Sequence, residues 1–114
     1  MKYPLLIILF FLLTTGCINK KEGKVKIIFD TDFGPDYDDV GALAFLHSMA
    51  DSGRAEILAT VSSNKHEMVA PSIDVINTYF GRSGLEIGAP KGHGASMGSG
   101  QHWADSIVSK YPLV

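Results

Sequence analysis

Five aspartates crowd into ten residues directly after a short apolar segment, and this crowding constrains the chain more than any other feature. Residues 25–29 are mostly β-branched or aromatic, which predicts a strand, and Gly34 permits a sharp turn after it. Carboxylates this close repel and raise one another's pKa values unless something neutralises them. A hard divalent cation bound through oxygen is the simplest neutraliser. We therefore expect this loop to fold its carboxylates inward; they are Asp30, Asp32, Asp36, Asp38 and Asp39.

The pattern of apolar segments and breaks predicts alternating strands and helices. Strands are expected at residues 25–29, 56–61 and 85–87. Helices are expected from a cap at Asp38 or Asp39 to residue 51, at 69–80 and at 103–111. This order predicts an α/β fold, a parallel sheet with flanking helices in a Rossmann-like order. The polar loops 30–39 and 62–67 both follow strands, so they should open on the same edge of the sheet.

The first predicted helix is apolar over most of its circumference, which predicts burial on most sides. His47 lies among these apolar residues and is expected to be a structural histidine. Three strands would also leave wide unpaired sheet edges. We therefore expect residues 25–114 to be the N-terminal portion of a larger α/β domain.

The first residues have the order of a bacterial export signal. Lys2 precedes an apolar run at residues 5–13, small residues follow at 14–16, and Cys17 comes next. The run is shorter than the roughly 20 residues that span a bilayer. We expect a signal peptide at 1–16, lipid on Cys17 and a tether to residue 24. The protein would be exported and held at a membrane, on the periplasmic or outer-membrane side, while a plain secreted protein is the alternative.

Charge and cysteine content exclude other classes. The net charge is −2, so no basic surplus exists to neutralise phosphates, and nucleic acid is not an expected partner. The single cysteine cannot form an internal disulfide. Hydrophobic residues make up 46% of the chain and charged residues 19%, which indicates a globular protein.

Residues 27–43 read I-I-F-D-T-D-F-G-P-D-Y-D-D-V-G-A-L. This segment resembles the N-terminal signature of the inosine-uridine-preferring nucleoside hydrolase family, Asp-x-Asp-Pro-Gly-x-Asp-Asp-Ala. Phe33 replaces the usual proline, and two extra residues precede the aspartate pair, as in an exported bacterial branch of that superfamily with the longer Asp-x-Asp-x-Gly-x-Asp-x-Asp-Asp form. The similarity continues through ILATVSSN, IDVINTYFGR and IGAPKG, and covers about residues 24–92.

The resemblance implies calcium-dependent hydrolysis of the N-glycosidic bond of ribonucleosides. Asp32 would be a Ca²⁺ ligand and the general base, and Asp39 a second ligand. Asp38 would accept a ribose hydroxyl, with Asp36 as the alternative, and Asn64 would lie near the ribose. The family completes its calcium shell with a backbone carbonyl from the middle of the domain and a C-terminal aspartate. The chain alone is therefore expected to be inactive, and a homo-oligomer is possible for the full-length family.

The sequence leaves two other functions open. One is a lipoprotein that binds a nucleoside or sugar without cleaving it. The other is a haloacid-dehalogenase-type phosphatase, with Asp30 as nucleophile and Asp32 as acid. That motif wants Thr or Val where Gly34 stands, and it leaves the last three aspartates unexplained.

Overall fold

A computed structural model describes residues 23–34, 36–97 and 102–111. Three strands, β1 (Val25–Thr31), β2 (Ala55–Ser62) and β3 (Glu86–Gly88), form one parallel sheet in the order β1-β2-β3. Helices α2 (Asp38–Asp51), α3 (Val69–Tyr79) and α4 (Trp103–Lys110) alternate with the strands or follow them. The predicted α/β class, element order and parallel sheet are confirmed.

An irregularity in the pairing of β1 with β2 decides which side chains face the helices. Ile27 pairs with Ile57 and Ile28 with Ala59, so Leu58 is an extra residue in β2. Beyond it the strands continue in step until Thr31 lies beside Ser62, and the amide of Ser63 donates to the carbonyl oxygen of Thr31 at 2.9 Å. The two strands end together, so the loops that follow them begin side by side, as predicted.

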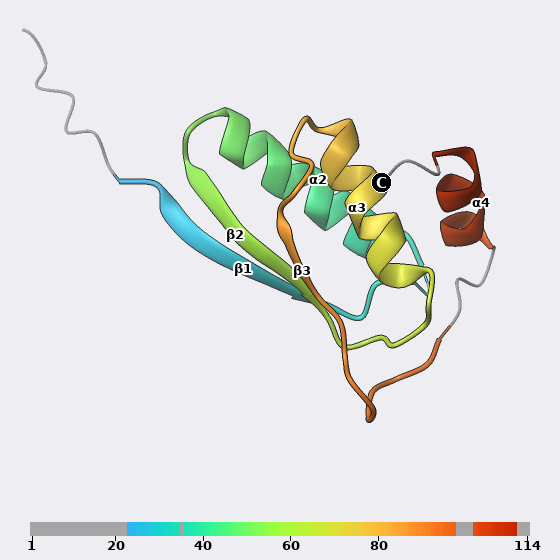
Figure 1. The fold of residues 1–114 in the computed structure, drawn as a ribbon. Helices are drawn as coiled ribbons and strands as arrows, with labels where there is room; N and C mark the ends of the chain where they lie inside the picture. Colours follow the sequence, from blue (N-terminus) through green and yellow to red (C-terminus); the bar gives the residue numbers. More distant parts are fainter. Residues whose placement is uncertain (1–22, 35, 98–101, 112–114) are drawn as a thin grey trace, which may run out of the picture.

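Helices α2 and α3 pack on one face of the sheet, and α4 lies beside α3 (Figure 1). Two groups of buried side chains form the core. One contains Phe33, Leu43, Val69 and Ile73, and the other contains Leu46, Ala55 and Ile57. The first group lies next to the aspartate loop, so burial of Phe33 ties that loop to the core.

The expectation that α2 is buried on most sides is wrong. Only Leu43, Leu46 and His47 are buried in this helix, and Phe45 is 66% exposed. The helix packs against the sheet, and its His47 contacts Asn77 and Phe80 at the end of α3. The described residues leave the side that carries Phe45 exposed. The opposite face of the sheet is also open, with Ile28 61% exposed.

Neither aspartate caps α2 as predicted. The N-cap is Tyr37, and no side chain makes a cap hydrogen bond there. Asp38 and Asp39 instead occupy the first turn, where the positive end of the helix dipole favours their charge.

The expected signal peptide, Cys17 and most of the tether lie outside the described residues. Among the helices that are described, none has the length and apolar character required to cross a membrane.

Candidate metal centre

The loops after all three strands meet at one edge of the sheet, and Asn64 joins them. Its Nδ2 lies 3.3 Å from the carbonyl oxygen of Asp32, 3.0 Å from that of Phe33 and 2.6 Å from that of Met97. Its Oδ1 accepts from the amides of His66 at 3.0 Å and Met97 at 3.1 Å. The buried Asn64 side chain therefore fixes the backbone around Asp32.

Gly34 is the point of closest approach between the aspartate loop and Asn64. Its φ is +144°, and a Cβ there would lie 2.9 Å from Nδ2 of Asn64 and 3.3 Å from the carbonyl oxygen of Met97. Neither that backbone conformation nor that space suits a larger residue. The sequence predicts the sharp turn at Gly34, and the structure adds the reason that no side chain fits.

Aromatic packing holds the loop from the other side. Phe33 is fully buried, and its ring meets Trp103 of α4 edge to face with centroids 5.3 Å apart. Tyr37 also packs on Trp103, with centroids 5.9 Å apart. The segment that carries the carboxylates is thus fixed at both ends before any ligand binds.

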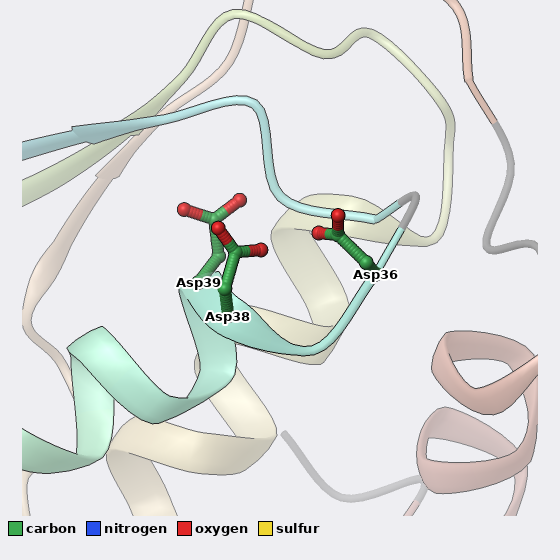
Figure 2. A group of neighbouring side chains, drawn as sticks. All are labelled: Asp36, Asp38 and Asp39. Atoms are coloured by element: carbon green, nitrogen blue, oxygen red, sulfur yellow. The ribbon is translucent and has the colours of Figure 1, made fainter.

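Three carboxylates of this segment converge. Oxygens of Asp36, Asp38 and Asp39 lie within 4.8 Å of one another. Asp38 and Asp39 lie together at the start of α2, and Asp36 turns toward them from the loop (Figure 2). Asp36 and Asp38 are exposed, and Asp39 is half-buried.

Crowding of the three carboxyl groups shifts their pKa values. A hydrogen bond between the side chains of Asp36 and Asp38 raises the pKa of Asp36 and lowers the pKa of Asp38. Burial raises the pKa of Asp39, as do the neighbouring Asp32 and Asp38 carboxylates, while a hydrogen bond from Thr31 opposes the rise. The site therefore holds more negative charge than its own groups stabilise.

A cation suits this arrangement. Two oxygens bound to one Ca²⁺ at about 2.4 Å can lie up to about 4.8 Å apart. The triad spans no more than that distance. Oδ2 of Asp39 is buried and has no hydrogen-bond partner among the described residues, so a cation would satisfy an atom that is otherwise orphaned. The three residues therefore fit a divalent cation that prefers oxygen ligands.

The structure brings some of the predicted site residues into the convergent group and leaves others outside it. Asp36 belongs to the convergent group, whereas Asp32 lies outside the triad, close enough to Asp39 for a side-chain hydrogen bond. Asn64 lies at the same edge, but its amide is engaged with backbone groups. Asp30 lines a separate open cleft with Ser63, His93 and residues of the loop after β3.

Sequence reasoning missed three contributors to this site. Thr31 accepts a hydrogen bond from the amide of Phe33 at 3.0 Å and also reaches Asp39. Met97 supplies two backbone partners for Asn64, and Trp103 packs on the loop. Met97 contributes only backbone atoms, so its residue type gives no sign of this role. Trp103 is the only tryptophan of the chain, and its residue type is a signal in the sequence for a packing role.

Comparison of the chain with protein-family models, curated proteins and solved structures finds no match. The motif residues and the geometry of this edge are therefore the basis for inferring a function.

Proposed function

We propose that this edge is the calcium and ribose side of a nucleoside hydrolase site, which cleaves the N-glycosidic bond of ribonucleosides to give ribose and free base. The observation that carries the proposal is the convergence of Asp36, Asp38 and Asp39 beside Asp32 at the carboxyl ends of parallel strands. In such sheets ligands bind beyond the carboxyl ends of the strands.

Asp39 and its neighbours would hold the ion. Asp39 is the best ligand, because its buried Oδ2 has no other partner among the described residues. Asp36 and Asp38 are exposed and can turn either to the ion or to the vicinal hydroxyls of a ribose. When bound, Ca²⁺ would supply positive charge that orients the ribose hydroxyls and polarises a water molecule.

Asp32 would act as the general base. Its carboxylate is exposed and lies beside Asp39, so it can reach a water on the ligand side of the triad. The transition state of ribosyl cleavage carries positive charge at C1′, and four carboxylates at this edge favour that charge. Asn64 holds the carbonyl groups of Asp32 and Phe33, which keeps the base in place.

The described residues offer only one wall of such a site, and Ca²⁺ prefers six to eight oxygen ligands. We propose that residues 25–114 belong to the first part of the domain, and that the remaining ligands come from chain outside it. Weak calcium binding and negligible turnover are therefore expected of the 114-residue chain itself.

The test measures the binding of inosine and uridine to the full chain. Ligand-observed NMR detects the binding, once with Ca²⁺ present and once with a chelator. We expect weak, calcium-dependent binding that requires both ribose hydroxyls, so 2′,3′-dideoxyinosine should not bind. An Asp38→Asn variant should bind more weakly, whereas Asp74→Asn, on α3, should not differ from the natural chain. Equal binding of the dideoxy compound would contradict the proposal.

Ribose released in the same samples, and phosphate released from phosphomonoesters in a separate assay with Mg²⁺, separate the alternatives. Magnesium-dependent phosphate release from phosphomonoesters would indicate the phosphatase. Binding without cleavage by a longer form that carries the remaining ligands would indicate a binding lipoprotein.

A further inference from the structure

Thr31, the last residue of β1, meets the aspartate loop from the side of the sheet. Only 5% of its surface is exposed. Its backbone lies beside Ser62 of β2, and its carbonyl oxygen accepts from the amide of Ser63 at 2.9 Å. A β-branched side chain also has few χ1 rotamers. The Thr31 hydroxyl is therefore held at a fixed position on the sheet.

This hydroxyl has one proton to donate, and Asp39 receives it. The amide of Phe33 donates to Oγ1 of Thr31 at 3.0 Å and so occupies a lone pair of that oxygen. The same hydroxyl makes a hydrogen bond with the Asp39 carboxylate, which can only accept when it is ionised. The direction of the bond is therefore set, because the end of β1 donates to the first turn of α2.

The two oxygens of Asp39 consequently have different surroundings. Oδ2 is buried and has no hydrogen-bond partner among the described residues, so the bond from Thr31 falls on Oδ1. A hydrogen bond on Oδ1 restricts rotation of the carboxylate and leaves Oδ2 free. Oδ2 is the atom that a bound cation would satisfy.

We propose that Thr31 is a positioning residue of the metal centre, whose hydroxyl holds Oδ1 of Asp39 so that Oδ2 faces the ion. This role rests on the proposed calcium site, and it belongs to a residue that touches neither ion nor substrate. Hydrogen-bond partners behind a metal ligand fix the orientation of that ligand, and their removal typically costs about 10- to 100-fold in metal affinity.

The first test is the dissociation constant for Ca²⁺ of the full chain, taken from its melting temperature over a titration with calcium chloride. Thr31→Val keeps the shape of the side chain and removes the hydroxyl, so the dissociation constant should rise about ten-fold or more. Thr31→Ser keeps the hydroxyl and should bind Ca²⁺ within about three-fold of the natural chain. A serine variant as weak as the valine variant would overturn the proposal.

Two control variants separate positioning of Asp39 from general effects of substitution. Thr60→Val makes the same replacement in β2, where the buried hydroxyl has no partner among the described residues. Ser63→Ala removes a bond of 3.3 Å to the carbonyl oxygen of Thr31 and leaves its hydroxyl in place. Both variants should keep the dissociation constant within about three-fold. A loss in either control equal to that in Thr31→Val would overturn the proposal.

A measurement without metal tests the hydrogen bond itself. With a chelator present at pH 7, Thr31→Val is compared in the natural chain and in an Asp39→Ala background. The valine substitution should lower the melting temperature by about 4 °C more in the natural chain, because only there does it break a bond to a charged group. Equal shifts in the two backgrounds would show that Thr31 does not act through Asp39.

Failure of the calcium site and failure of this role give different results. No gain in melting temperature with calcium in the natural chain would overturn both. A gain that Asp39→Asn abolishes and Thr31→Val leaves unchanged would keep the calcium site and overturn only the role of Thr31.

Discussion

Asn64 and Met97 are 33 residues apart in sequence, yet each donates a hydrogen bond to the other: Nδ2 of Asn64 lies 2.6 Å from the Met97 carbonyl oxygen, and the Met97 amide lies 3.1 Å from Oδ1 of Asn64. The same amide nitrogen holds the backbone of Asp32 and Phe33. One buried side chain thus connects the loop after β1 with the loop after β3.

Replacing Asn64 should therefore destabilise the protein and loosen the aspartate loop. Asn64→Ala leaves several buried backbone groups unpaired, and we expect the free energy of unfolding to fall by about 2–4 kcal/mol. Urea denaturation measures the change. Ser63→Ala, which loses one bond of 3.3 Å to the Thr31 carbonyl, should cost less than about 1 kcal/mol. Equal losses in the two variants would show that Asn64 does not act as the connection.

Alanine substitutions at two glycines should have opposite effects on stability, because one glycine lies in the crowded loop and the other in an open part of a helix. Gly34→Ala forces a Cβ to within 2.9 Å of Asn64 Nδ2 at a φ of +144°, so it should lower stability by about 1–3 kcal/mol and weaken calcium binding. Gly41 lies in α2 with nothing within 4 Å of its Cβ position. Gly41→Ala should therefore stabilise by up to about 1 kcal/mol. Thermal melts of both variants give the comparison, and a stabilising Gly34→Ala would contradict the loop geometry.

Stability should fall on mild acidification because of His47. This imidazole is fully buried, stacks on Phe80, and has Nε2 2.9 Å from Oδ1 of Asn77 and Nδ1 3.3 Å from Nη1 of Arg82. Burial lowers the pKa of His47 below its usual 6.5. The unfolded chain then binds the proton more readily, so the stability from neutral His47 is present above about pH 6.5 and is lost as the pH falls toward the folded pKa.

The expected slope from this group is at most about 1.4 kcal/mol per pH unit. Urea denaturation between pH 7.5 and pH 5 measures it. His47→Leu should flatten the profile, and His93→Gln, at an exposed position, should leave it unchanged. The range stops at pH 5 because protonation of the crowded Asp36 and Asp39, whose pKa values are raised, acts in the opposite direction. An unaltered slope in His47→Leu would exclude His47 as the cause.

Attachment to a membrane is the prediction for the N-terminal residues. Cys17→Ser removes the proposed lipid acceptor and should move the protein from the membrane fraction to the soluble exported fraction. Immunoblotting of separated fractions measures the shift, with Ser63→Ala as a control that keeps Cys17. Retention of Cys17→Ser in membranes would point to another anchor.

Local patterns in the sequence are enough to predict most of the fold. Strand and helix positions followed from apolar spacing and from Gly and Pro breaks, and the common edge of the two polar loops followed from strand order. The exposure of Phe45 could not be predicted, because burial depends on which elements lie beside a helix. The meeting of Asp36 rather than Asp32 with Asp38 and Asp39 depends on the path of the loop around buried Phe33, which residue types alone do not determine.

The central claim is that the aspartate triad binds calcium through Asp39. The most direct measurement is the melting temperature of the full chain over a calcium titration, beside Asp39→Asn and the control Asp74→Asn. Without calcium, Asp39→Asn should melt higher than the natural chain at pH 7, because a raised carboxyl pKa means that its charge destabilises the folded state. With calcium at about ten times its dissociation constant, the natural chain and Asp74→Asn should gain about 5–10 °C, and Asp39→Asn should gain almost nothing. The same gain in Asp39→Asn as in the natural chain, or no gain in any of the three, would contradict the claim.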